Sequence, residues 1–340
     1  MRYNPLVSII IVNWNGGKIF KKCLNSLSKI KYKNWELIVV DNGSIDKSEE
    51  FPRLIIKNKI SVIKNIKNVG FASANNQGAL LSKGKYILLL NNDTVVSEDF
   101  LSILVNRMEE SRNIGVLQPK IFLLDKSGYL DNTGSFFTKI GFLKHQGFLE
   151  SDTGQYNKEQ EVFSVKGACM LLNAELVRKI GLFDDDFFSY FEESDFCWRV
   201  WLDGKKVIYY PKAYIYHKVG FTIRRLNVRD LNYHYYKNRV CSLIKNLELK
   251  NLVLILPIHI IISLSICSVF LVRGNFRNSY MIIKALIWNI VNLVSTLNKR
   301  ANIQSKRKIS DKYIFNYLTR HIDWIRYWND FKRIESDIKR

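Results

Sequence analysis

The chain has 340 residues, of which 47% are hydrophobic and 13% aromatic, so it can form a sizeable core and is not globally disordered. Its five cysteines are scattered and never stand in a CxxC spacing, which argues against a disulfide framework and a zinc site. The net charge of +21 requires an anionic partner. Fifteen basic and five acidic residues from Arg273 onward directly follow the most hydrophobic run, which favours a membrane surface over nucleic acid.

The first hundred residues alternate between short apolar runs and helical patterns. Each run fits a buried strand, and several are rich in β-branched residues. The runs are residues 7–12, 35–40, 61–63 and 86–90. Strands that alternate with helices of about 10–15 residues predict an α/β fold with a Rossmann-like, mostly parallel sheet and helices on both faces.

Polar residues stand directly after each predicted strand. These clusters are Asn13–Gly17, Asp41–Ser44, Asn65–Gly70 and Asn91–Thr94. In an open α/β sheet, the loops at the carboxyl ends of the strands lie along one edge, where ligands bind. The pattern therefore predicts a nucleotide site at this edge.

The next part of the chain is less regular. Residues 120–161 have weak periodicity and many Gly, Ser and Asp residues, which predicts loops and short strands on the substrate side. Regular structure is expected again at 162–173 and 205–216, and a helix at 227–246 is expected to close the catalytic domain. No segment shaped like a signal peptide precedes the first strand, so we expect this domain in the cytosol.

A hydrophobic segment follows the catalytic domain. Residues 252–272 carry no charge and are long enough to cross a membrane, although Pro257 and His259 leave a tilted or re-entrant helix open. Residues 280–297 have a polar stripe, which favours an interfacial helix over a second span. With the basic tail, this predicts attachment to the cytoplasmic face of the cell membrane, while a buried helix of a soluble core is the alternative. The predicted domains are 1–246, 247–298 and 299–340.

Two polar clusters contain candidate nucleotide contacts. Asp41 can accept hydrogen bonds from a base or from ribose hydroxyls, or it can close an Asx turn. Asn68, Gly70 and Asn75 lie where a loop enters a helix rich in small residues. Gly70 permits close backbone approach or a positive φ, and packing within the protein is the alternative to a ligand.

Asn91-Asn92-Asp93 follows a predicted strand and offers one carboxylate beside two amide oxygens. A hard divalent cation that neutralises a diphosphate prefers oxygen ligands, so the motif suits Mg²⁺ or Mn²⁺. A cap of the following turn is the alternative for Asp93. His217 ends a later strand and is a ligand candidate only if that strand end approaches Asp93.

Carboxylates are crowded among aromatic residues in the segment FFSYFEESDFCWRV, residues 187–200. Crowding of Glu192, Glu193 and Asp195 raises their affinity for protons, which suits a general base that works near neutral pH. A solvated start of a helix is the alternative, and Arg199 can pair with one of the carboxylates.

Seven motifs stand in an order that resembles the family 2 glycosyltransferases with a GT-A fold, and within them the rhamnosyltransferase-like branch of bacterial surface polysaccharide synthesis. The motifs are VSIIIVNWNG, VVDNGS, NVGFASANN, LLNNDT, VKGACMLL, YFEESDFCWR and YHKVG. The resemblance covers roughly residues 5–245 and implies an inverting hexosyltransferase. It would move a sugar, with rhamnose suggested by the branch, from a nucleotide-diphosphate sugar to a hydroxyl of a lipid-linked saccharide.

The resemblance also implies roles for single residues. Asp93 falls on the family's metal-binding motif, where Asn91 replaces an acid, and His217 corresponds to a histidine that completes metal coordination in some relatives. Glu193 aligns with the catalytic base, usually an aspartate. The implied nucleotide-sugar contacts are Asn13, Asp41, Asn68, Gly70, Asn75, Asn91 and Asn92. The expected sugar and acceptor pocket comprises Gly167, Ala168, Glu192 and Asp195.

Two other functions remain compatible with the sequence. A sugar nucleotidyltransferase shares an α/β nucleotide domain and a metal, but it is expected to have a glycine-rich loop with a basic residue after the first strand. A non-catalytic membrane-bound scaffold predicts no metal-dependent donor binding. No nucleic-acid partner is expected.

Overall fold

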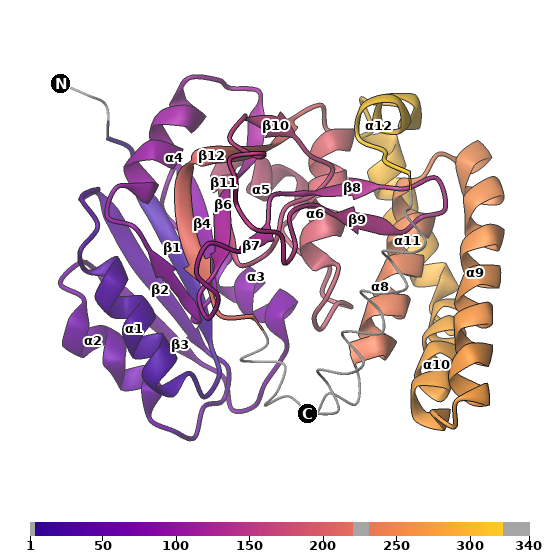
Figure 1. The fold of residues 1–340 in the computed structure, drawn as a ribbon, viewed down its shortest axis with the longest axis horizontal. Coiled ribbons are helices and arrows are strands. Elements are labelled where there is room, and N and C mark those ends of the chain that lie inside the picture. Colours follow the sequence, from indigo (N-terminus) through magenta and orange to yellow (C-terminus); the bar gives the residue numbers. More distant parts are fainter. Residues whose placement is uncertain (1–3, 220–230, 322–340) are drawn as a thin grey trace. The chain divides into compact units, whose positions relative to one another are not determined.

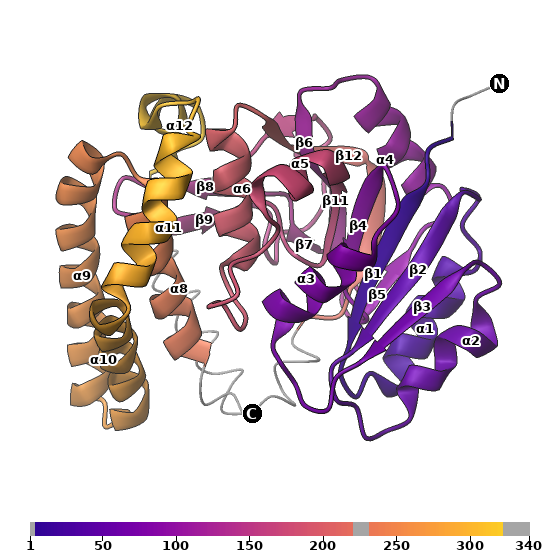
Figure 2. The same cartoon turned by 180° about the vertical axis from the view of Figure 1, so that it is seen from behind.

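The computed structural model describes residues 4–219 and 231–321 (Figures 1 and 2). The chain divides into two compact units. Unit 1 comprises Met1–Ser135, His145–Phe221 and Ser305–Ile309, and unit 2 comprises Phe136–Lys144, Thr222–Gln304 and Ser310–Arg340.

Unit 1 is an α/β domain around one sheet. Its helices are α1 (Gly17–Leu27), α2 (Phe51–Ile55), α3 (Phe71–Leu81), α4 (Phe100–Glu109), α5 (Ala174–Ile180) and α6 (Glu192–Leu202). Its strands are β1 (Val7–Asn13), β2 (Trp35–Asp41), β3 (Ile60–Lys64), β4 (Tyr86–Leu90), β5 (Thr94–Val96), β6 (Ile114–Leu123), β7 (Leu130–Asn132), β10 (Gln160–Glu161), β11 (Cys169–Asn173) and β12 (Lys206–His217).

The sheet is parallel in its first half and mixed in its second. The strand order is β10-β12-β6-β11-β4-β1-β2-β3, with β5 paired to β12 and β7 to β6. Strands β3, β2, β1 and β4 are mutually parallel, because helices connect the successive strands. Strand β11 runs antiparallel between β4 and β6, and β12 is parallel to β6. The prediction of a mostly parallel sheet therefore holds for the N-terminal half.

Both faces of the central strands are covered by helices. Every residue of β2 and β4 is buried, as expected of strands between two helical layers. Ile9 and Ile11 share a core with Phe20 of α1 and Leu104 of α4. On the opposite face, α3 packs so closely that a Cβ on its Gly78 would lie 2.5 Å from an Ile10 methyl carbon, and the two layers are visible in Figures 1 and 2.

Unit 2 is mainly helical. Its described elements are the hairpin of β8 (Ser135–Phe137) and β9 (Leu143–His145) and the helices α8 (Leu231–Asn246), α9 (Leu249–Val272), α10 (Phe276–Val291), α11 (Leu293–Ser305) and α12 (Asp311–Tyr317). Helix α8, which was expected to close the catalytic domain, packs through Tyr236 against α9 and α10 in unit 2. Residues 227–230 of that predicted helix lie outside the described residues. The functional division at residues 246 and 298 stays a prediction.

Helices α9 to α11 combine buried polar residues with exposed apolar ones. Helix α9 is long and apolar enough to cross a membrane, and α10 and α11 together pass the same test although they are bent by 67°. His259 and Ser263 of α9 are fully buried, and Asn289 and Thr296 of the predicted polar stripe are buried as well. Asn292 of the stripe is half-buried and Lys284 is exposed, so only part of the stripe faces the interior of the unit, and many large apolar side chains are exposed.

Candidate active site

Three of the predicted nucleotide contacts lie together at the carboxyl edge of the sheet. Parallel pairing places Asn13, the last residue of β1, beside Asp41, the last residue of β2. The Asn13 amide nitrogen donates to Asp41 Oδ1 at 3.2 Å and to Ser48 Oγ at 2.8 Å, and its oxygen accepts from Asn92 Nδ2 at 3.0 Å. All four side chains are buried. Asn13 is thus the centre of a network that fixes Asp41 and Asn92.

The loop before α3 is held by contacts within the protein. Asn68 Oδ1 accepts hydrogen bonds from Asn42 Nδ2 at 2.8 Å and from the Gly70 amide at 2.9 Å. Asn75 is buried and donates to the Phe71 carbonyl one turn earlier. Gly70 has a φ of 91°, and a Cβ there would lie 2.5 Å from the Phe188 carbonyl oxygen. The close approach expected at Gly70 is therefore made by the backbone of residue 188, on the segment that leads into α6.

Replacing Gly70 with alanine is expected to destabilise the protein by roughly 3 kcal/mol or more, because a positive φ and a backbone clash act together. Gly128 is the matched control, since it has a φ of 73° and no atom within 4 Å of its ideal Cβ position. Gly128→Ala should cost only about 1 kcal/mol. Equal losses in urea unfolding would show that the contact with residue 188 contributes nothing.

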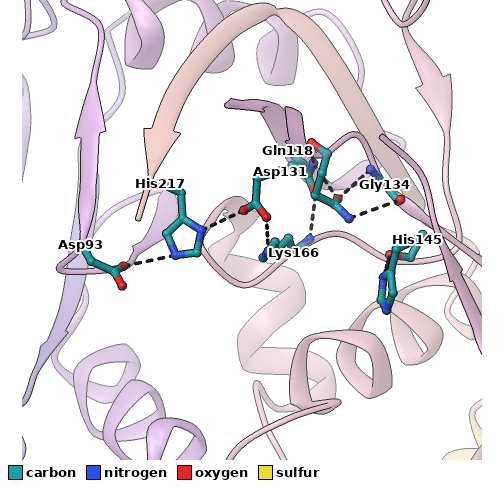
Figure 3. Close-up of polar contacts among 9 residues, drawn as sticks. Asp93, Gln118, Asp131, Gly134, His145, Lys166 and His217 are labelled. Carbon is teal, nitrogen blue, oxygen red and sulfur yellow. Dashed lines mark hydrogen bonds and ion pairs between the residues drawn. The ribbon is translucent and has the colours of Figure 1, made fainter. Parts of the chain in front are cut away.

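Asp93 and His217 are brought together by strand pairing. Strand β5 is antiparallel to β12, and Thr94 is the register partner of His217. This places Asp93 Oδ1 3.2 Å from His217 Nε2 (Figure 3). The other ring nitrogen of His217 lies 2.8 Å from Asp131 Oδ2, and Lys166 Nζ lies 2.5 Å from Asp131 Oδ1. Four alternating charged groups therefore run from the end of β4 to the loop before β11.

The charges of this row stabilise each other. Burial lowers the pKa of His217, but the carboxylates of Asp93 and Asp131 outweigh it and raise the pKa to about 9. Burial raises the pKa of Asp131, but Lys166 and His217 outweigh it and lower the pKa to about 2. At neutral pH, His217 is thus a cation between two carboxylates.

Asp93 and His217 fit a divalent cation as two of its ligands. Asp93 Oδ1 is buried and, apart from the ion pair with His217, has no hydrogen-bond partner among the described residues. Neighbouring ligands of an octahedral Mg²⁺ at about 2.1 Å lie about 3 Å apart, close to the observed separation. A cation would replace the proton on Nε2, while Asp131 fixes the ring from behind. No group of three or more His, Cys, Asp or Glu side chains suited to a metal occurs within residues 4–219 and 231–321, so substrate oxygens and water must complete the shell.

Helix α6 begins with the predicted catalytic carboxylates. Tyr190 and Phe191, directly before it, have φ values of 70° and 71°, a left-handed conformation that side chains rarely adopt. Burial raises the pKa of Glu193 to about 7, and Lys166 opposes this shift. Burial and the neighbouring Glu193 also raise the pKa of Glu192, and its Oε2 has no hydrogen-bond partner among the described residues. Glu193 is therefore the carboxylate suited to exchange protons near neutral pH.

The remaining pocket candidates differ in position. Gly167 lies beside Glu193, since a Cβ on it would be 3.9 Å from Glu193 Cβ. Ala168 is buried, and its carbonyl accepts a hydrogen bond from the Asn91 amide at 3.0 Å. Asp195 is fully buried and pairs with Arg199 Nε at 3.1 Å. Asp195 is thus placed inside the protein as part of an ion pair, not in a pocket, because the first turn of a helix directs successive side chains to different sides.

Two charged residues of the site were not predicted. Lys166 stands directly before Gly167 in the motif VKGACMLL, and Asp131 lies in the segment of weak periodicity. Their neighbour Gln118 is buried on β6; it accepts from the Lys166 amide at 2.6 Å and donates to the Asn132 side chain at 3.2 Å (Figure 3). The position of Lys166 beside a predicted pocket residue was the one available signal.

Comparisons with known proteins identify the family of this chain. The profile of glycosyl transferase family 2 matches residues 8–181, just over half of the chain. Glycosyltransferase GlyG of Streptococcus pneumoniae is 26% identical over 65% of this chain and 74% of its own length. The low-salt glycan biosynthesis hexosyltransferase Agl10 of Haloferax volcanii is 28% identical over 57% of this chain and 61% of its own.

A solved structure shares the fold. The structure of GalNAc-T7 with UDP, GalNAc and Mn²⁺ has a TM-score of 0.58 and 17% identity, and the match covers 72% of this chain and 48% of that one. At this identity the likeness establishes a GT-A fold. Together with the family match, it shows that the chain belongs to glycosyl transferase family 2 and is a glycosyltransferase.

Proposed function

We propose that this enzyme is an inverting glycosyltransferase that moves a sugar from a nucleoside-diphosphate donor to a hydroxyl of a saccharide, with the assistance of a divalent cation. The observation that carries this proposal is the position of Glu193 and of the Asp93–His217 pair. Lys166 contacts the carboxylate behind His217, and its charge acts on Glu193. Lys166 thus links the proposed base, Glu193, to the proposed cation site at Asp93 and His217.

The mechanism follows from these positions. Glu193 accepts the proton of the acceptor hydroxyl, whose oxygen forms a bond to the anomeric carbon as the bond to the diphosphate oxygen breaks. Because attack and departure occur on opposite sides, a single displacement inverts the configuration. Asp93 and His217 would hold a cation, Mg²⁺ or Mn²⁺, whose chemistry is to neutralise the charge on the leaving diphosphate. The Mn²⁺ and UDP bound to GalNAc-T7 support this assignment.

The finer assignment rests on the sequence resemblance. The rhamnosyltransferase-like branch suggests deoxythymidine-diphosphate rhamnose as donor and a lipid-linked saccharide as acceptor. Asn13, Asp41 and Asn92 would bind the nucleoside, since they form one fixed network at the sheet edge. Gly167, which lies beside Glu193, would line the sugar and acceptor pocket.

A panel of UDP-, GDP- and dTDP-linked sugars tests the proposed function. Purified enzyme is expected to hydrolyse at least one donor slowly in Mg²⁺ or Mn²⁺, and not in EDTA. Rhamnose transfer requires turnover of the dTDP-linked donor. If no donor in the panel is turned over with either metal, the proposal fails.

Unit 2 supports a membrane surface as partner, at the cytoplasmic face. Many large apolar side chains of α9 to α11 are exposed, while His259, Ser263 and Asn289 are buried, which is an arrangement expected of helices that face lipid. Arg273 and Arg277, at the turn between α9 and α10, suit the anionic headgroups of that leaflet. The exposed apolar residues include Val253, Leu254, Ile258, Ile261, Leu264, Ile283, Ile287, Ile290 and Val294.

Changing both Leu254 and Ile261 to glutamate is expected to weaken binding to phosphatidylglycerol-containing vesicles by roughly tenfold or more, because charge enters the lipid-facing side. The two side chains are 65% and 63% exposed, so folding should be little affected. Binding is measured by flotation of the protein with the vesicles. Leu54→Glu is the matched control, because Leu54 is an exposed leucine of α2 in unit 1 and its substitution should leave flotation unchanged. Equal flotation of all three proteins would contradict a lipid-facing role of α9.

A further inference from the structure

Asp131 and Lys166 form an ion pair directly behind the proposed cation site. Asp131 has no exposed side-chain surface, while 29% of the Lys166 side chain is exposed. One oxygen of Asp131 lies 2.5 Å from Lys166 Nζ, and the other lies 2.8 Å from His217 Nδ1. Asp131 therefore contacts His217, the candidate metal ligand, but not Asp93 (Figure 3). Such a carboxylate typically orients a metal-binding histidine and increases its basicity.

Gln118 holds both partners of the ion pair in place. Its side-chain oxygen accepts from the backbone amide of Lys166, and its nitrogen donates to the backbone and side chain of Asn132, the neighbour of Asp131. Gln118 is fully buried on β6, in the middle of the sheet. The geometry between the two charged residues is thus set by the sheet and not by a loose surface contact.

The pair differs from the structural ion pair of α6. Arg199 pairs with Asp195 in the same helix and also donates to three backbone carbonyls, those of Ile180, Gly181 and Leu182, so its function is to close a turn of the chain. Lys166 has one carboxylate partner, is partly exposed and lies next to Gly167 and hence to the base. Replacement of a whole buried ion pair by apolar side chains is often neutral for stability, so stability alone does not explain why charged groups occupy these positions.

We propose that Asp131 and Lys166 are positioning residues of the transfer reaction: Asp131 fixes the ring of His217 toward the cation, and Lys166 holds Asp131 and places a positive charge beside Glu193. This inference rests on the proposed function. In this proposal Lys166 acts both on Glu193 and, through Asp131, on the cation site. Its loss should therefore change the pH dependence set by Glu193 and the binding of the cation, which are measured separately.

Glu193 interacts electrostatically with several charged or titratable groups among the described residues. Glu192 precedes it on α6, Tyr190 and Cys197 lie on either side along the chain, and Lys166 approaches from the loop before β11. Burial raises the pKa of Glu192, Tyr190 and Cys197, which favours the neutral form of each. Removal of the positive charge of Lys166 should therefore raise the pKa of Glu193.

The test compares Lys166→Met, Lys166→Arg and Asp131→Asn in the full-length enzyme. In the wild type, donor turnover should increase with pH as Glu193 ionises. In Lys166→Met this increase should occur roughly one pH unit higher, because the charge that favours ionised Glu193 is lost. Lys166→Arg keeps the charge and should restore the profile. Asp131→Asn should weaken Mn²⁺ binding by roughly 10–100-fold, measured on the protein and Mn²⁺ alone by the paramagnetic resonance of the free ion.

Lys206→Met is the matched control. Lys206 pairs with Glu161 at 2.5 Å at the other end of β12, and its loss should change neither the pH profile nor Mn²⁺ binding. An unshifted profile in Lys166→Met together with unchanged Mn²⁺ binding in Asp131→Asn overturns the inference while wild-type turnover stands. Absence of metal-dependent turnover in the wild type instead overturns the proposed function.

Discussion

Replacement of Glu193 by glutamine is expected to lower the rate of sugar transfer by roughly 10²–10⁴-fold while donor binding stays nearly intact. Glutamine keeps the shape of the side chain but cannot accept the proton of the acceptor hydroxyl. In the wild type, the transfer rate should rise as the pH increases through about 7, because only ionised Glu193 acts as a base. Radiolabelled transfer and equilibrium binding of the donor check the two halves of this expectation.

Glu192→Gln is the informative companion variant. Its carboxyl is buried next to Glu193, and burial and that neighbour raise its pKa and so favour the neutral form, which an amide resembles; the amide should therefore perturb the site much less. A larger loss in Glu192→Gln than in Glu193→Gln would reverse the assignment of the base. Normal turnover in Glu193→Gln would remove the base from this helix altogether.

Asp93→Asn is expected to abolish the dependence of donor binding on metal and to lower turnover by roughly 10²–10³-fold. The amide has the same size and can still meet His217, but it lacks the charge that attracts a divalent cation. Mn²⁺ titration of donor binding measures the effect. The control is Asp99→Asn, an exposed carboxylate paired with Lys31 at 3.0 Å, which should behave as wild type. Metal-dependent turnover that survives in Asp93→Asn would place the cation elsewhere.

Local patterns were enough to predict the sheet edge of this site. Polar residues directly after strands must meet at one edge when the strands are parallel, which is why Asn13, Asp41 and Asn92 lie together. The pairing of β5 with β12 then supplies the condition under which His217 reaches Asp93. That pairing is antiparallel and joins residues far apart in the sequence, so no local sequence pattern could predict it.

Other parts of the site depend on contacts that the sequence does not encode locally. Asp131 and Lys166 are 35 residues apart and meet only because β7 pairs with β6 and Gln118 bridges the two segments. The acidic cluster predicted a base but not which carboxylates face inward, and Asp195 proved to be the partner of Arg199. The apolar helices were predicted from hydropathy, whereas the inward position of Asn289 depends on the packing of α10 against α8, where its side chain donates to the Lys237 carbonyl.

The two left-handed residues before α6 have a consequence for efforts to improve this enzyme. Each left-handed residue costs of the order of 1–3 kcal/mol, and together the two set the direction of the first turn of α6, which contains Glu193. Glycine at Tyr190 or Phe191 would relieve the steric penalty and loosen the turn that aims Glu193. Directed evolution for heat resistance and directed evolution for turnover should therefore select opposite residues at these two positions.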